Sequence, residues 1–134
     1  MPRYLLDTNI CIYIGKNQPI EVRQKFEQLQ ANDIAISVIT YGELRYGAQK
    51  SQSHDKALKV INQLTSVIQI LPLDENAGGH YGEIRAELAA TGQIIGNNDL
   101  WIAAHARANN LILVSNTMKE FERVSGLQLE NWAK

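Results

Sequence analysis

The sequence predicts an α/β fold of three layers, in which a central, mostly parallel sheet of four to five strands lies between helices. Two observations carry this prediction. Short apolar runs without alternation, at residues 3–6, 34–38, 67–71 and 111–115, are typical of strands that are buried on both faces, as in parallel sheets. The segments between them place apolar residues three or four positions apart, which indicates amphipathic helices. Strands that alternate with helices in this way favour a parallel sheet covered on both faces.

The composition is that of an ordinary globular protein, and we expect a single domain over residues 1–134. The chain holds 13 basic and 14 acidic residues, which argues against a strongly basic nucleic-acid-binding protein but leaves room for a local basic patch. The one cysteine, Cys11, has no partner for an internal disulfide and suits a reducing cytosol. The N-terminus lacks a signal-peptide pattern, and no apolar run approaches the length of a membrane span. We therefore expect a cytoplasmic protein without a membrane partner.

The first half of the chain is expected to supply two strands and four helices. In the helix that follows Pro19, the apolar residues Val22, Phe26 and Leu29 recur with a helical period. The strands are residues 3–6 and 34–38, and the helices run from about 10 to 15, 20 to 30, 39 to 49 and 55 to 64.

The second half begins with a strand at residues 67–71, which Pro72 ends. Asp74 is a plausible N-cap for a long helix over residues 75–90, and Gly92 lies just past its end. A helix of this length spans about 24 Å. The short loop after it can hardly return the chain along the sheet, so we expect this helix to lean away from the sheet. The remaining elements are a helix at 99–108, a strand at 111–115, a short helix at 117–122 and a small edge strand at 127–129.

Four carboxylates lie where these elements begin or end. Asp7 follows the first strand, and Glu43 lies in the helix after the second strand. Asp99 opens the helix that leads into the fourth strand, and Glu120 lies in the short helix after it. Because ligands of α/β proteins bind at the carboxyl ends of parallel strands, we expect these side chains to face one rim of the sheet. The alternative is a local role for each acid, as a helix cap, a partner of a helix dipole or part of a surface turn.

Carboxylates that converge on one rim repel one another. Two of them about 4 Å apart cost roughly 4 kcal/mol at an effective dielectric constant of 20, unless their pKa values rise or a cation lies between them. An all-oxygen cluster without cysteine or histidine suits Mg²⁺ or Mn²⁺ better than zinc. Such an ion activates water and neutralises phosphate charge, so metal-assisted hydrolysis of a phosphodiester is the expected chemistry.

Four stretches stand out in order along the chain: Leu5-Leu6-Asp7-Thr8-Asn9, Ser37-Val38-Ile39-Thr40-Tyr41-Gly42-Glu43-Leu44, Gly96-Asn97-Asn98-Asp99-Leu100 with Ile102-Ala103-Ala104-His105-Ala106, and Leu113-Val114-Ser115-Asn116 with Glu120-Phe121. Together they resemble a PIN domain and, more narrowly, the VapC toxins of bacterial toxin–antitoxin pairs. The similarity extends over essentially the whole chain, to the closing Leu129-Glu130-Asn131-Trp132.

The resemblance implies that Asp7, Glu43 and Asp99 bind the metal ion and that these acids, with Glu120, are the catalytic residues. PIN domains often carry their fourth acid near the position of Thr117, which is not acidic here, and Glu120 would substitute for it. The implied polar support comes from Thr8, Asn9, Ser115 and Asn116.

The resemblance also implies a Mg²⁺-dependent endoribonuclease that cuts structured RNA. Among closely similar toxins the substrate is initiator tRNA, cut in the anticodon loop, and the cut inhibits translation. The implied partners are a VapB-type antitoxin that fills the acidic groove and a second copy of the chain in a homodimer. Operator DNA would be bound only through the antitoxin.

Support for RNA binding from the residues themselves is modest. The cations Arg45, Lys50 and Lys16 are candidates to meet RNA phosphates, with Tyr41 or Tyr46 available for stacking, and ordinary solvated charges are the alternative. Further cations of this kind are Arg85 and Lys119. We expect packing roles for three other residues: His105 as a satisfied core residue, and Trp101 and Trp132 as core or dimer contacts.

Three other functions compete with a ribonuclease for this sequence, and each lacks support from particular residues. An aspartyl-phosphate phosphatase needs a second acid two residues after Asp7, where Asn9 stands. A receiver-like signalling domain would use Asp74 as its phosphate acceptor but needs a pair of acids after the first strand. A PIN-like module that only binds a protein would not need three intact acids.

Overall fold

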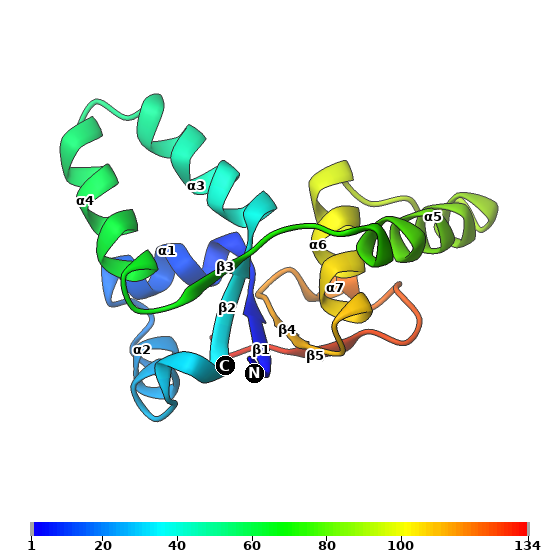
Figure 1. Ribbon diagram of the computed structural model, residues 1–134, viewed down its shortest axis with the longest axis horizontal. Coiled ribbons are helices and arrows are strands. Elements are labelled where there is room, and N and C mark those ends of the chain that lie inside the picture. The colour runs from blue at the N-terminus through cyan, green and yellow to red at the C-terminus, as the bar shows by residue number, and fades with distance from the viewer. Residues whose placement is uncertain (1, 134) are drawn as a thin grey trace.

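The computed structural model describes residues 2–133, and within them the chain forms an all-parallel sheet of five strands in the order β3-β2-β1-β4-β5 (Figure 1). The predicted α/β fold is confirmed. The strands are β1 (Tyr4–Leu6), β2 (Ile34–Ser37), β3 (Gln69–Leu71), β4 (Ile112–Val114) and β5 (Gln128–Glu130). The helices are α1 (Thr8–Lys16), α2 (Ile20–Glu27), the 3₁₀ helix η1 (Ala31–Asp33), α3 (Val38–Gln49), α4 (His54–Thr65), α5 (Glu75–Ala90), α6 (Asn97–Ala108) and α7 (Met118–Phe121).

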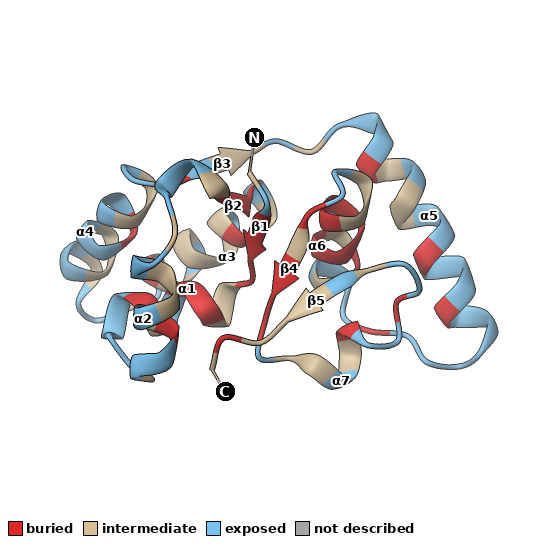
Figure 2. Ribbon diagram, turned by 90° about the horizontal axis from the view of Figure 1, so that it is seen from below, coloured by how far each residue is buried: buried red, intermediate tan, exposed pale blue. Residues whose placement is uncertain are grey.

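The central strand β1 pairs with β2 on one side and β4 on the other, with Leu5 opposite both Ala35 and Leu113. Every residue of β1 and β2 is buried, whereas the edge strands β3 and β5 are partly exposed (Figure 2). The exposed edges explain why their bounds differ from the sequence prediction. The third strand begins at Gln69 instead of residue 67, because Val67 is exposed and lies in the turn after α4.

Two apolar clusters cover the two faces of the sheet. Leu5 and Leu113 point into the cluster that α5, α6 and α7 complete, with Ile84, Ile102 and Phe121 among its buried members. The other face packs against α1 and α2, and its buried members include Tyr4, Leu6, Ile10, Ile14, Val22 and Trp132. The sheet therefore lies between two helical layers, as a three-layer fold requires.

Helix α5 leans away from the sheet, as expected, and packs along α6 (Figure 1). It begins at Asp74, whose carboxylate accepts from the backbone N–H of Ala77 at 3.0 Å. Ile84 and Leu88 form its buried stripe, and Gly92 follows its end in the left-handed conformation (φ 66°), which glycine adopts without a steric penalty.

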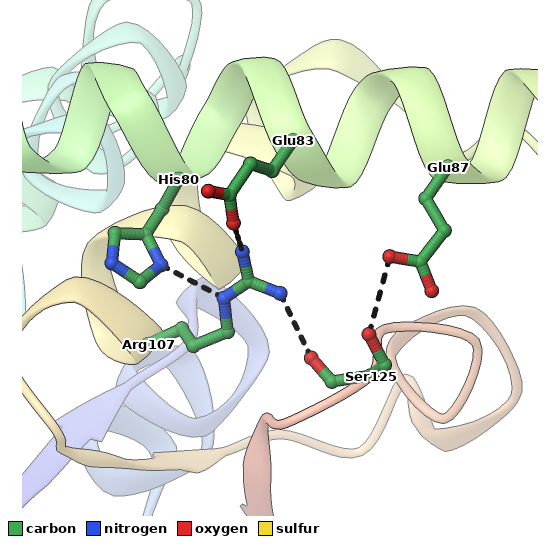
Figure 3. A network of polar contacts seen from close by, with 5 residues as sticks. All are labelled: His80, Glu83, Glu87, Arg107 and Ser125. Atoms are coloured by element: carbon green, nitrogen blue, oxygen red, sulfur yellow. Dashed lines mark hydrogen bonds and ion pairs between the residues drawn. The ribbon is translucent and has the colours of Figure 1, made fainter.

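A polar network fixes the angle between α5 and α6 (Figure 3). The guanidinium of Arg107, on α6, donates to His80 Nδ1 at 2.8 Å, to Glu83 Oε1 at 2.8 Å and to the carbonyl of Ser125 at 2.9 Å. The Ser125 hydroxyl donates in turn to Glu87 at 3.2 Å. One cation thus ties α5, α6 and the loop before β5 together.

In residues 2–133 no helix is long and apolar enough to cross a bilayer.

Candidate active site

Asp7 lies directly after β1, at the edge where parallel strands present their carboxyl ends. It is the N-cap of α1, because its Oδ1 accepts from the backbone N–H of Thr8 at 2.8 Å, and the helix therefore begins two residues earlier than expected. The other carboxylate oxygen, Oδ2, accepts from the hydroxyl of Ser115 at 2.7 Å. Asp7 was expected either to cap a helix or to face the acidic rim. The structure shows that the same carboxylate caps α1 and lies at the end of β1 where the rim begins.

Opposing effects act on the charge of Asp7. Its side chain is buried, and this burial raises its pKa. The hydrogen bonds from Ser115 and Thr8 lower the pKa, and the negative charge of Glu43 raises it again. The net pKa is raised, so the ionised form of Asp7 is held at a cost in free energy.

Glu43 lies in α3 and is held between two other helices. The Thr8 hydroxyl, on α1, donates a short hydrogen bond to Glu43 Oε1. The side-chain amide of Asn98, on α6, donates to Oε2 at 3.3 Å. These contacts turn Glu43 toward the rim where β1 ends.

Asp99 lies in the first turn of α6, which begins at Asn97. Its pKa is raised to about 6, first by burial and then by the negative charges of Asp7, Glu43 and Glu120. Glu43 is bonded to Thr8 and Asn98, the chain neighbours of Asp7 and Asp99, so these three acids from distant segments face one rim of the sheet. The charge of Glu120 acts on Asp99 from α7.

The residues after β4 form a neutral polar network beside these acids. Asn9 donates to the Thr117 hydroxyl at 3.0 Å and accepts from the backbone N–H of Asn116 at 3.3 Å. The Asn116 amide donates to Tyr13 and accepts from Asn131, at 3.1 and 2.8 Å. Thr117, where an acid is common in PIN domains, is thus a bound hydroxyl, and the nearest acid on the following helix is Glu120.

The donor set decides which metal ion fits. Every candidate ligand is a carboxylate oxygen, with hydroxyls and amides beside them, and such oxygen donors suit Mg²⁺ or Mn²⁺. Among residues 2–133, no three histidine, cysteine, aspartate or glutamate side chains lie close enough together to hold an ion as they stand. The chemistry of the residues fits a hard divalent cation, which keeps several of its waters and needs only one or two direct carboxylate ligands.

The three cations named as RNA contacts lie in different places. Arg45 follows Glu43 by two residues, about 200° around α3, so it lies on the opposite face of that helix. Lys50 follows Glu43 by seven residues and shares its face. Lys16 ends α1, about 12 Å along the helix axis from Thr8.

His105 differs in one respect from the expectation of a satisfied core residue. It is buried, and its Nδ1 lies 2.8 Å from the Ser37 hydroxyl, but its Nε2 has no hydrogen-bond partner among the described residues. Cys11 is buried, as expected for a filler residue. Trp132 is buried edge-on against Tyr4, whereas Trp101 stacks on Tyr81 with ring centroids 3.9 Å apart.

Sequence reasoning missed two residues that contact the rim. Asn98 binds Glu43, and Tyr81 donates from its hydroxyl to Asn97. The run of polar residues from Gly96 to Asp99 was the available signal, because side chains at a helix start are free to bind neighbouring elements. Asp74, the candidate acceptor of a receiver-like domain, is instead the cap of α5.

Comparison with known proteins identifies close relatives over the whole chain. Residues 4–127 match the PIN domain family. The chain is 47% identical over 132 residues to Ribonuclease VapC2 of Haemophilus influenzae, which covers 98% of this chain and 99% of that protein. It is also 47% identical over 133 residues to the tRNA(fMet)-specific endonuclease VapC of Shigella flexneri, covering 99% of this chain and 100% of that one.

Solved structures agree with the sequence matches. The crystal structure of DNA-bound VapBC from Salmonella typhimurium contains a chain that superposes with a TM-score of 0.93 at 41% identity, covering 98% of this chain and 99% of that chain. VapBC2 from Rickettsia felis, bound to a DNA fragment from its promoter, contains a chain that superposes with a TM-score of 0.90 at 43% identity, covering 96% and 98%. The same fold therefore occurs in these proteins.

Proposed function

The chain belongs to the PIN-domain family, in the branch of the VapC ribonuclease toxins, and we propose that it cuts initiator tRNA in the anticodon loop with the help of Mg²⁺. The observation that supports the chemical part is the set of hydrogen bonds that joins the segments of Asp7, Glu43 and Asp99: Ser115 to Asp7, Thr8 to Glu43 and Asn98 to Glu43. The substrate is proposed from the relatives of Shigella flexneri and Salmonella typhimurium, whose names specify tRNA(fMet).

PIN-domain ribonucleases are generally metal-dependent, and in this chain Asp7, Glu43 and Asp99 would hold the ion. When bound, Mg²⁺ supplies a water of lowered pKa and neutralises negative charge on the phosphate. Mn²⁺ has the same preference for oxygen ligands.

The other side chains orient the acids. Ser115 holds one oxygen of Asp7 and the backbone of Thr8 holds the other. The Thr8 hydroxyl and the Asn98 amide fix both oxygens of Glu43. Side chains that are held before the substrate arrives need no reorganisation during the reaction.

Glu120 completes the proposed set as the fourth acid, in place of the neutral Thr117. Two features support this assignment: the negative charge of Glu120 raises the pKa of Asp99, and Thr117 is a neutral hydroxyl that accepts a hydrogen bond from Asn9. Asn9 and Asn116 would then shape the loop after β4 without contributing charge.

The test is cleavage of purified initiator tRNA by the purified protein. Cleavage in Mg²⁺ should stop in EDTA, and Asp7→Asn and Asp99→Asn should each lower the rate by about 100-fold or more, because a few kcal/mol of transition-state stabilisation is lost. Glu122→Gln, an exposed acid next to α7, is the matched control and should cut at the wild-type rate. Normal cleavage by both aspartate variants would remove the site assignment.

We further propose that the chain forms a homodimer and binds a cognate VapB-type antitoxin, which alone contacts operator DNA. The relatives in the crystal structures are VapBC complexes, and two of them are bound to DNA. The net charge of −1 argues against a strongly basic nucleic-acid-binding protein. Light scattering of the protein alone, and mobility shifts of promoter DNA with and without antitoxin, test the three parts separately.

A further inference from the structure

Two helices near the acids carry a tyrosine followed one turn later by a cation that contacts it. On α3, the ammonium of Lys50 lies 4.9 Å from the ring centroid of Tyr46. On α5, the guanidinium of Arg85 lies 5.9 Å from the centroid of Tyr81 and donates to the Tyr81 hydroxyl at 2.7 Å. Among the described residues neither cation forms an ion pair with a carboxylate. Their charges are therefore available to an anion from outside the chain.

The pair on α3 continues the face of that helix that holds Glu43. Tyr46 and Lys50 follow Glu43 by three and seven residues, which places all three side chains in one stripe. Glu43 is bonded to Asn98 on α6, so the stripe faces the acidic rim and extends outward from it. Tyr46 is 66% exposed, and its ring is free to stack on a base.

The pair on α5 is connected to the opposite side of the rim. Tyr81 is stacked on Trp101 at an interplanar angle of 15°, and its hydroxyl donates to Asn97 in the first turn of α6. That turn also contains Asp99. Arg85 is thus a cation fixed in place by an aromatic stack near the start of α6, on the face of that helix that carries Asn97 and Trp101.

The acids lie between these two pairs. Helix α3 follows β2 on one side of β1, whereas α6 leads into β4 on the other side, and α5 packs on α6 (Figure 1). A phosphodiester chain that enters an acidic rim is repelled, so attractive contacts have to come from cations beside the acids. Tyr46–Lys50 and Tyr81–Arg85 are placed to supply them.

We infer that Tyr46, Lys50 and Arg85 form the binding surface for unpaired RNA nucleotides on either side of the phosphate that is cut. Tyr46 stacks on an exposed base, and Lys50 and Arg85 bind flanking phosphates. This inference rests on the proposed ribonuclease function. Because a base must be unstacked to lie on Tyr46, the surface favours a loop over a duplex. Tyr41 and Arg45 form a similar pair, in which the Arg45 guanidinium lies 5.6 Å from the centroid of the Tyr41 ring. This pair lies on the opposite face of α3 from Glu43.

Binding is measured apart from cleavage, in the Asp99→Asn background with EDTA, by fluorescence anisotropy. The probes are a synthetic RNA hairpin with the anticodon loop of initiator tRNA and a blunt RNA duplex. Tyr46→Ala should weaken hairpin binding by about tenfold and leave duplex binding unchanged. Lys50→Gln and Arg85→Gln should each weaken hairpin binding by about threefold to tenfold and reduce the salt dependence by about one counterion.

Arg45→Gln is the comparison that decides the inference, since it removes a tyrosine-bound cation from the other face. If it weakens hairpin binding as much as Lys50→Gln and Arg85→Gln do, the surface is not specific and the inference is overturned. Hairpin affinities unchanged in all three site variants, with loss of antitoxin binding instead, would overturn it in favour of a protein-docking face. Circular dichroism melting of each variant excludes unfolding as the cause.

A second arm separates this inference from the proposed function. With Asp99 restored, the three site variants should raise KM and leave kcat unchanged, because uniform binding is lost. If the wild-type protein does not cut tRNA yet the hairpin binds through these three residues, the proposed catalysis fails while the binding surface stands. If tRNA is cut and the variants keep the wild-type KM, the binding surface alone fails.

Discussion

Asp7 and Asp99 carry their charges in different ways. Asp7 accepts hydrogen bonds from Ser115 and Thr8, which lower its pKa and offset part of the cost of burial. The carboxylate of Asp99 accepts no side-chain hydrogen bond among the described residues and feels three neighbouring negative charges. Asp99 is therefore the acid whose ionisation most opposes folding when no cation is bound.

Replacement of Asp99 by asparagine should stabilise the metal-free protein. The folded-state pKa of about 6 lies above the ordinary value of 3.8, so the folded state binds the proton more tightly than the unfolded state does. The penalty is fully present above pH 6 and disappears as the pH falls toward 4. In EDTA, Asp99→Asn should melt above the wild type at pH 7.5, and the difference should shrink at pH 4.5. Scanning calorimetry checks this, with Glu122→Gln as the variant that leaves the melting temperature unchanged.

The positions of Asp7 and Asp99 at the carboxyl edge of the sheet could be predicted from the sequence, because Asp7 follows β1 and Asp99 lies in the first turn of the helix that leads into β4. The hydrogen bonds among them could not. Asn98 reaches Glu43 only because α6 begins at Asn97, two residues earlier than its apolar pattern indicates. Side-chain contacts between segments far apart in sequence depend on helix ends and angles, which local periodicity does not determine.

At the scale of elements, α5 is held mainly by α6. Arg107, with a side chain only 13% exposed, makes two polar contacts to α5 and a third to the loop before β5. Arg107→Met should lower the free energy of unfolding by about 2–4 kcal/mol, since buried bonds to a charged group are lost. Its partner Glu83 is 73% exposed, and Glu83→Gln should cost no more than about 0.5 kcal/mol. Equal losses in urea denaturation would show that the surface ion pair, and not the buried bonds, fixes α5.

His105 joins α6 to the start of α3 through Ser37, the N-cap of α3. Burial lowers the pKa of His105, although the charge of Asp74 offsets this in part, so the folded state holds the neutral ring. The corresponding stability is present above about pH 6.5, the unfolded value, and is lost as the pH falls below it. The stability difference between wild type and His105→Gln should therefore decrease from pH 7.5 to pH 5.5. A difference that stays constant in chemical denaturation over this range would contradict a buried neutral ring.

The periodicity of apolar residues predicted whether most elements are helices or strands, but it did not predict where the edge strands begin and end. Val67 continues an apolar run into β3 yet lies exposed in a turn, and the last strand begins at Gln128, one residue later than expected. Edge strands pack on one side only, so their apolar runs are weaker guides than those of β1 and β2. The lean of α5 was predictable from its length, whereas the Arg107 network was not.

For the whole molecule, divalent cations and protons compete for the same rim. Mg²⁺ should stabilise the folded wild-type protein and so raise its melting temperature. At a Mg²⁺ concentration of 100 times the dissociation constant, the free energy of unfolding should increase by about 2.7 kcal/mol. The stabilisation should be smaller at pH 5.5 than at pH 7.5, because protonated Asp99 is a poor ligand. Asp99→Asn should lose most of it. An equal Mg²⁺ effect in both proteins would place the ion elsewhere.

The hydrogen bond between Ser115 and Asp7 joins residues 108 positions apart, near the two ends of the chain. Closing such a long loop costs more conformational entropy than closing a short one. A polypeptide still emerging from the ribosome lacks β4 and Ser115, so its Asp7 has no fixed orientation and no complete ring of acids. The orientation of Asp7 therefore depends on residues on both sides of most of the fold, and a fragment that lacks β4 has no Ser115 to hold this carboxylate.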